Sequence, residues 1–178
     1  MGQLGKGTGM RKRLVITSIS CALFALSPSA ILAANSDVAA GQGSVSSTNP
    51  RGTLFARFVS GASDTTPGIG EDGNGTISLK FQSTDPLQPS FEVRAKVTCV
   101  NAVANRAVVV GDVTRTTRPE LQTMIFYIED NGPPVAGQPV DRFSATISAE
   151  VFPVELVCQN FTSVVPLESG NFTVKDRA

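Results

Sequence analysis

Residues 91–113 read FEVRAKVTCVNAVANRAVVVGDV, and within them two strand patterns flank a turn signal. From Phe91 to Cys99 every second side chain is apolar, while the side chains between them are charged or carry a hydroxyl group. Because successive side chains of a β-strand point to opposite faces, this alternation predicts a strand with one buried and one solvated face. A hairpin turn is expected at Asn105, because asparagine tolerates a left-handed backbone better than most residues.

The return strand of this hairpin is apolar on both faces from Ala107 to Val110, and so is the later stretch Leu121–Ile128. Such sequences are typical of strands that are buried on both faces. Two explanations are open: loops cover the outer face of these strands, or that face is an apolar surface for a protein partner or self-association. Gly111, which follows the apolar run, indicates a β-bulge or a close backbone approach.

Shorter alternating segments continue through the chain from residue 51. We expect strands at 54–59, 76–82, 121–130, 142–150, 154–158 and 170–175, and no segment after residue 34 repeats its apolar residues at helical spacing. The sequence therefore predicts an all-β fold for residues 51–178, a single antiparallel β-sandwich or flattened β-barrel of about seven to nine strands. Residues 35–50, rich in Ser, Ala and Gly, are expected to form a flexible leader with only a short strand near 44–46.

Residues 1–34 have the pattern of a secretory signal peptide. Basic residues 11–13 precede the apolar segment Leu14–Leu26, and small residues follow up to Ala34. The apolar segment is short for a bilayer span, so an N-terminal signal helix cleaved after residue 33 or 34 is preferred to a retained anchor. Met10 fits the start of this pattern better than Met1 does.

The charge balance changes when the signal is removed. The whole chain has 15 basic and 15 acidic residues; four of the basic ones and none of the acidic ones lie in residues 1–34, which leaves 11 basic and 15 acidic residues. A mildly acidic protein that is secreted to the extracellular space, periplasm or cell envelope is expected. The net charge argues against nucleic acid and against an anionic membrane surface as partners.

Two of the three cysteines, Cys99 and Cys158, remain after removal of the signal. In an oxidising compartment they are expected to form a disulfide, which would stabilise the fold by about 4 kcal/mol in the chain-entropy model. The alternation places Cys99 on the buried face of its strand. Val154, Leu156 and Cys158 are likewise expected to share one buried strand face.

The chain contains no histidine, which excludes Ser-His and Cys-His nucleophile pairs and the commonest zinc ligand. Carboxylates remain as candidates for acid–base chemistry, and Asp112, Glu129, Asp130 and Asp141 are the ones considered. Their spacing does not pair them, and each lies where a strand ends or a turn begins. The sequence therefore assigns no catalytic, cofactor-binding or metal-binding residue.

Three kinds of short motif resemble known sites, and none of them assigns a site here. Residues 68–73 match G-x-G-x-x-G, but a strand follows where the dinucleotide fingerprint needs a helix. Residues 72–75, DGNG, resemble half of a calcium loop without its closing glutamate. The N-x-T sequences at Asn74, Asn160 and Asn171 are glycosylation acceptors only in a host that glycosylates them.

Four segments occur in an order that resembles a group of secreted bacterial β-rich proteins of uncharacterised function. They are VTCVNAVANRAVVVGDVT (97–114), FYIEDNGPP (126–134), DRFSATIS (141–148) and PLESGNFTVKD (166–176). Ala104 stands where the group tends to have glycine. The resemblance implies secretion, a β-rich domain and a paired cysteine, and it implies no activity.

Taken together, these features predict a secreted, non-catalytic extracellular or envelope β domain with a binding or structural role. Two alternatives remain open. One is a carboxylate-dependent hydrolase acting on carbohydrate, which needs two acids facing one another in a cleft. The other is a carrier of a small ligand, which needs a cavity inside a barrel.

Overall fold

The computed structural model describes residues 36–65, 72–133, 135–136 and 139–177. The predicted signal helix and most of the G-x-G-x-x-G match lie outside these residues. The predicted all-β fold is confirmed, since the described residues form one antiparallel sheet of nine strands and a single helical turn. Within the described part of the chain, no helix is both long and apolar enough to cross a membrane.

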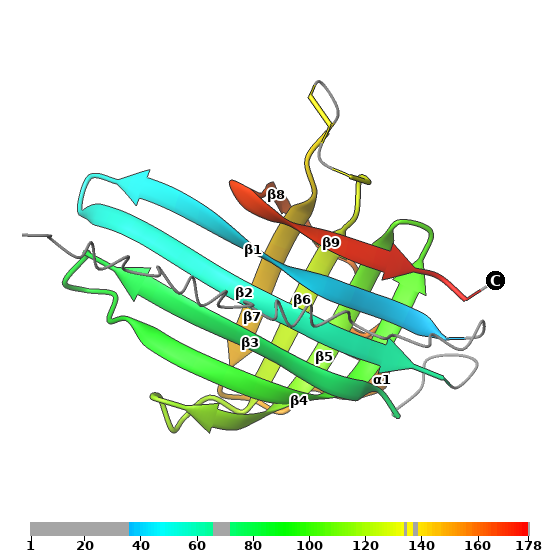
Figure 1. Ribbon diagram of the computed structural model, residues 1–178. Helices are drawn as coiled ribbons and strands as arrows, with labels where there is room; N and C mark the ends of the chain where they lie inside the picture. The colour runs from blue at the N-terminus through cyan, green and yellow to red at the C-terminus, as the bar shows by residue number, and fades with distance from the viewer. Residues whose placement is uncertain (1–35, 66–71, 134, 137–138, 178) are drawn as a thin grey trace, which may run out of the picture. The chain divides into compact units, whose positions relative to one another are not determined.

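The elements follow one another in a simple order. The strands are β1 (Asp37–Asn49), β2 (Gly52–Asp64), β3 (Asn74–Ser83), β4 (Phe91–Val103), β5 (Arg106–Thr116), β6 (Thr123–Glu129), β7 (Arg142–Ser148), β8 (Val165–Pro166) and β9 (Ser169–Lys175), with the helical turn α1 (Val154–Val157) before β8. Strands β1 to β8 pair with their neighbours in sequence, and β9 then pairs with β1. Figure 1 shows β5, β6 and β7 crossing behind β1–β4 at a steep angle. The single sheet therefore curls into a half-barrel.

The inner, concave face of the curled sheet holds the main core. Phe58 of β2 stacks on Phe143 of β7, with ring centroids 3.5 Å apart, and on Phe172 of β9, with centroids 5.6 Å apart. Phe126 of β6 meets Phe58 and Phe143 edge-on. All four rings are almost completely buried. Strands that are far apart in the sheet order are thus joined through aromatic side chains.

The expected flexible leader is wrong, because residues 37–49 form β1, one of the longest strands of the sheet. It pairs with β2 on one side and β9 on the other. Its glycines allow close backbone approach: a Cβ atom at Gly41 would lie 2.3 Å from the carbonyl oxygen of Asn171. Small residues that suggest a linker in the sequence are here required by tight strand packing.

A β-bulge in β4 reverses the face expected for Cys99. Val97 pairs with Gly111 and Cys99 pairs with the next residue back, Val110, so Thr98 is the extra residue. Val97 therefore points into the inner core and Cys99 points outward. The predictions for Gly111 are confirmed, since the bulge lies beside it and a Cβ atom there would lie 2.7 Å from the Lys96 carbonyl oxygen.

The strand expected at 154–158 is also wrong, because residues 154–157 form the helical turn α1. Pro153 precedes the turn, and the Cys158 amide closes it by donating to the Val154 carbonyl at 2.9 Å. Proline presets the backbone for a first helical turn, and four residues are too few for apolar spacing to separate helix from strand. The predicted disulfide between Cys99 and Cys158 is confirmed, with Cα atoms 6.4 Å apart.

Candidate functional site

Two of the four candidate carboxylates, Asp130 and Asp141, bind the edge of the last strand. Asp141 accepts a hydrogen bond from the Phe172 amide at 2.6 Å, and Asp130 accepts one from the Val174 amide at 2.9 Å. The other Asp141 oxygen accepts a hydrogen bond from the Asn131 amide, and the other Asp130 oxygen accepts one from the Gly132 amide, both at 2.8 Å. Both acids thus satisfy backbone donors of β9 that no strand pairs with.

The other two candidates lie at opposite ends of the β5–β6 ladder. Glu129, opposite Arg106, forms ion pairs with Arg106 at 3.1 Å and with Arg142 at 3.9 Å. Asp112, opposite Thr123, lies exposed on the outer face of β5. Asp130 and Asp141 are thus brought together at the free edge of β9, here termed the seam, while Asp112 is far along the strands from Glu129. Among the described residues, no group of three or more His, Cys, Asp or Glu side chains is placed to hold a metal ion.

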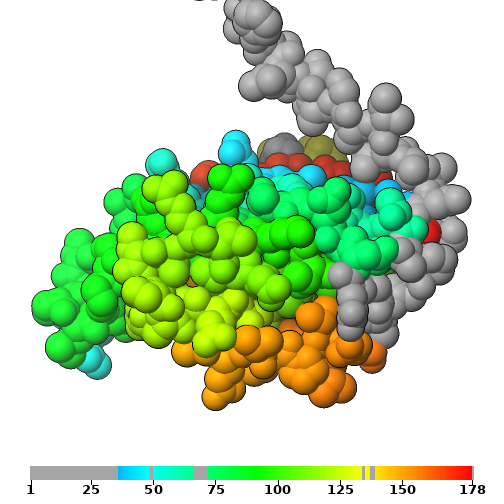
Figure 2. Space-filling view, turned by 90° about the horizontal axis from the view of Figure 1, so that it is seen from below, coloured from blue at the N-terminus to red at the C-terminus, as the bar shows by residue number. Residues whose placement is uncertain are grey.

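Residues 149–164, here termed the covering segment, pack on the outer face of β5 and β6. Side chains of this segment bury Val108, Val110, Ile125 and Tyr127 together with the disulfide. In Figure 2 the segment, in orange, forms a layer against the green and yellow-green part of the sheet. The apolar outer face of these strands is therefore covered by a loop, which is the first of the two explanations considered for their sequences.

A different part of the outer surface is strongly basic. The outward side of β2–β5, here termed the basic face, carries five exposed cations: Arg57, Lys80, Arg94, Lys96 and Arg115. Two acidic side chains, Glu92 and Asp112, share this face. The local excess of positive charge contrasts with the mildly acidic balance predicted for the mature chain.

The strand register places these cations in directly opposed pairs. Arg57 lies opposite Lys80 on β2 and β3, and Arg94 lies opposite Arg115 on β4 and β5. Glu92 lies opposite Lys80 and forms an ion pair with it at 2.7 Å. For the other four cations, the described residues offer no carboxylate within the 4.0 Å of an ion pair.

The cations of the basic face lower the pKa of Glu92, which lies on the same face. The hydrogen bond from Lys80 lowers the pKa of Glu92 below its ordinary value of 4.5, and the charges of Lys80 and Arg115 lower it further. Glu92 therefore stays ionised over a wider pH range than an isolated glutamate.

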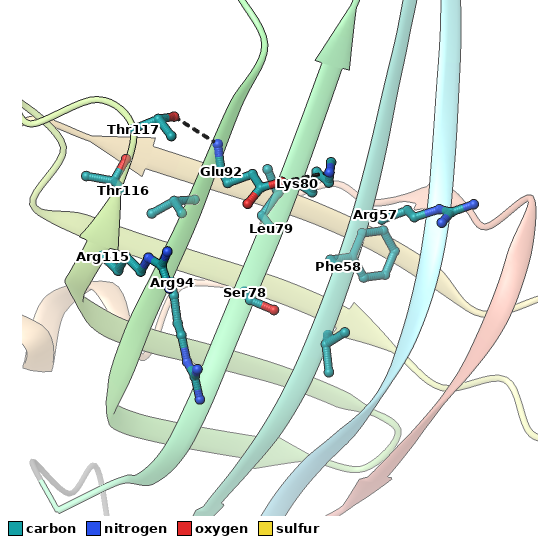
Figure 3. Close-up of a pocket in the computed structure, with 12 residues that line it drawn as sticks. Arg57, Phe58, Ser78, Leu79, Lys80, Glu92, Arg94, Arg115, Thr116 and Thr117 are labelled. Atoms are coloured by element: carbon teal, nitrogen blue, oxygen red, sulfur yellow. Dashed lines mark hydrogen bonds and ion pairs between the residues drawn. The ribbon is translucent and has the colours of Figure 1, made fainter.

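A shallow hollow of about 370 Å³ lies between the two cation pairs. Arg57, Lys80, Arg94 and Arg115 line it from four neighbouring strands, and Figure 3 shows the Arg57 side chain extending towards β1, away from Lys80. The other lining residues are the apolar Phe58, Val59, Leu79 and Val93, the hydroxylated Ser78, Thr116 and Thr117, and the acidic Glu92. Thr117 is held in place because its hydroxyl oxygen accepts the Glu92 amide at 3.1 Å. A shallow hollow surrounded by cations suits an anionic ligand that lies along the surface.

The chain matches no family model, no curated protein and no solved structure. The basic face and its hollow are therefore the features on which a functional proposal rests. Sequence reasoning missed this site because each cation occupies one of the alternate, solvent-facing positions of its strand, where charged residues are common. Only the register between strands reveals that the cations face one another.

A second hollow, of about 350 Å³, opens at one end of the half-barrel. Its lining is mainly apolar and comes from both walls of the curled sheet, with Val45, Phe81 and Phe91 from the front strands and Ile147 and Val165 from the back. These side chains are only partly buried or exposed. The half-barrel therefore has an apolar opening.

Proposed function

We propose that this protein is a secreted, non-catalytic binding domain of the extracellular space or cell envelope, and that it holds an anionic ligand on its basic face. The opposition of Arg94 and Arg115 across the β4–β5 ladder carries this proposal. Like charges directly opposite one another destabilise a sheet, and the attraction of Arg115 to Glu92 is the weakest influence on that carboxylate, so this opposition costs the fold free energy. Binding of an anion converts the repulsion into attraction.

The secretory pattern of residues 1–34 and the Cys99–Cys158 disulfide support a location outside the cytoplasm. An anionic ligand is compatible with a mildly acidic protein, because the potential that a ligand meets depends on local charge. The seam-bound carboxylates Asp130 and Asp141 favour a binding role over a carboxylate-dependent hydrolase, since backbone donors occupy their oxygens.

The proposal is tested by binding of the secreted protein to the anionic polymers of a cell-envelope extract. We expect binding at about 50 mM salt that falls steeply by about 200 mM salt. Arg115→Glu should weaken it by about tenfold or more. Lys175→Glu, the matched control on β9, makes the same charge change away from the basic face and should leave binding within about twofold. Equal losses in the two variants would contradict the proposal.

The apolar opening favours a second candidate function, carriage of a small apolar ligand. Its volume of about 350 Å³ lies within the range of ligand sites, and Phe81 and Phe91 stack at 5.1 Å to form one wall. A fluorescent fatty-acid analogue should bind the wild-type protein and be excluded by Ala145→Trp, which fills the opening. Failure of the analogue to bind would remove this candidate.

A further inference from the structure

We propose that the ligand of the basic face is a linear polymer of polyol or saccharide units joined by phosphodiester groups. This inference rests on the proposed function and names the chemistry of the ligand. The two opposed cation pairs carry it, namely Arg57 with Lys80 and Arg94 with Arg115.

Each pair can hold one phosphate between two neighbouring strands. Paired strands lie about 4.8 Å apart, so two long cationic side chains that rise from directly opposite positions can converge on one group. A phosphodiester presents two charged oxygens on a tetrahedral phosphorus, and these oxygens can accept from two separate donors. A carboxylate presents both oxygens in one plane and is satisfied by the fork of a single arginine.

The placement of the two pairs indicates a repeating ligand. The pairs lie on successive pairs of strands, and they are offset by one outward-facing position, since Lys80 pairs with Glu92 and Ser78 pairs with Arg94. A ligand that reaches both pairs must cross four strands, or about 14 Å at ordinary strand spacing. The hollow between them has the hydroxyl groups of Ser78, Thr116 and Thr117 for the uncharged linking unit.

The floor of the hollow favours a polyol or saccharide linker over a nucleic acid. Single-stranded nucleic acids bind by stacking their bases on exposed aromatic rings. Phe58 also lines the hollow, but its ring is almost completely buried in the inner core, and Phe55, the nearest outward ring on β2, has the Arg57 guanidinium over it at 5.4 Å. The surplus of acidic residues predicted for the mature chain also opposes nucleic acid as the ligand.

The ionic contact of Lys80 with Glu92 does not block this use. Both side chains are more than half exposed, and exposed ion pairs contribute little free energy. An ammonium group has three donors, so Lys80 can hold Glu92 and a phosphate oxygen together.

The test compares three probes against the secreted protein by isothermal titration calorimetry. They are synthetic poly(glycerol phosphate), polygalacturonate as a carboxylate polymer, and single-stranded oligothymidylate. We expect poly(glycerol phosphate) to bind at least about tenfold more tightly than the other two, with log K falling against log salt with a slope of about 1.4 for two bound phosphates. Monomeric glycerol phosphate should bind far more weakly, because it reaches only one cation pair.

The same titrations with Arg94→Gln, Arg57→Gln and Lys175→Gln locate the site. The first two variants should each weaken binding of poly(glycerol phosphate), and Lys175→Gln should not. If polygalacturonate binds as tightly and with the same losses, the phosphodiester inference fails while the basic face remains an anion site. Tighter binding of oligothymidylate would replace the polymer class with nucleic acid. If no probe binds, or if all variants behave alike, the proposed function fails as well.

Discussion

Ala104 occupies a backbone conformation that glycine would adopt at lower cost. It is the first of the two turn residues between β4 and β5, and its φ of +56° makes it the only non-glycine residue with positive φ in the described part of the chain. The left-handed residue of the turn was expected at Asn105, and the structure places it one residue earlier, at Ala104. The Asp176 carboxylate, just after β9, accepts a hydrogen bond from the Ala104 amide at 2.8 Å and holds the turn, which no local pattern shows.

Replacing Ala104 by glycine should stabilise the protein. A left-handed alanine costs about 1 kcal/mol, which glycine avoids, so A104G should raise the free energy of unfolding by about that amount in urea denaturation. N105G is the control, because Asn105 has negative φ and its side-chain amide donates to the Asp130 carbonyl at 2.9 Å. That variant should lose stability. A loss in A104G as well would contradict the explanation.

Replacement of Arg115 by glutamate should raise the stability of the protein and weaken its binding of the anionic ligand. R115E places a carboxylate opposite Arg94, which replaces a repulsion by an attraction, so the free energy of unfolding should rise by about 0.5 kcal/mol. Binding of the anionic ligand should weaken in the same protein. Raised stability in low salt that disappears in high salt is the expected signature in urea denaturation. A variant that is destabilised at low salt would refute the like-charge argument.

The buried Asp141 should be sensitive to loss of one carboxylate oxygen. Its two oxygens accept two different backbone amides, and an asparagine has only one acceptor oxygen. D141N should therefore lower the free energy of unfolding by about 2 kcal/mol in chemical denaturation. D112N, which changes an exposed acid on β5, is the matched control and should change stability little. Similar effects of both changes would argue against the seam role.

The covering segment shows how one element explains a pattern in others. Strands β5 and β6 have apolar residues on both faces because the inner core and the covering segment each bury one of them. The sequence pattern revealed the double burial. It did not reveal what covers the outer face, because the covering segment has few regular elements and its attachment depends on the outward turn of Cys99 at the bulge.

Reduction of the disulfide should release the covering segment. The bond closes a separation of 59 residues, which corresponds to about 4 kcal/mol in the chain-entropy model. With a reductant we expect stronger binding of an apolar dye and new proteolytic cleavage within residues 149–164. The variant with both Cys99 and Cys158 changed to alanine should show both features without reductant and no further change with it. Unchanged proteolysis of the reduced wild type would show that packing alone holds the segment.

Strands were predictable from sequence where side chains alternate in size and polarity, and not where the backbone determines the packing. The pattern of Phe91–Val97 identified β4 and its inner face, whereas β1, with Gly41 and Gly43 at its centre, has no such pattern. The basic face belongs to neither case. Each of its cations was assigned to a solvated position, but their opposition depends on which residues of separate strands pair.

For the protein as a whole, acidic and basic side chains have different uses. Asp37, Asp130, Asp141 and Asp176 accept backbone amides near the seam, while most cations of β2–β5 are left to solvent. Acids that support the fold and cations that face outward give a molecule with a small net charge and a strongly basic face.

Acidification should strengthen binding to the basic face. The lowered pKa of Glu92 means that its stabilising pairing with Lys80 is complete above the unfolded value near 4.5 and is lost as pH falls through the lower, folded value. Once Glu92 is protonated, Lys80 is free and a phosphodiester remains ionised. Titrations of poly(glycerol phosphate) at neutral pH and below the Glu92 pKa should show the increase, and E92Q should bind with little pH dependence. A wild type and an E92Q variant with the same pH profile would contradict this role.

The pairing of the first and last strands also determines when the domain can fold. Val38 pairs with Lys175, and β9 supplies Phe172 to the aromatic core. Contacts between such distant parts of a chain form slowly, because the loop between them must be closed before they stabilise anything. Residues 169–175 must therefore be available before β1 has both of its neighbours. Until then the domain is incompletely folded, which is the condition in which a polypeptide can still be threaded through a narrow pore.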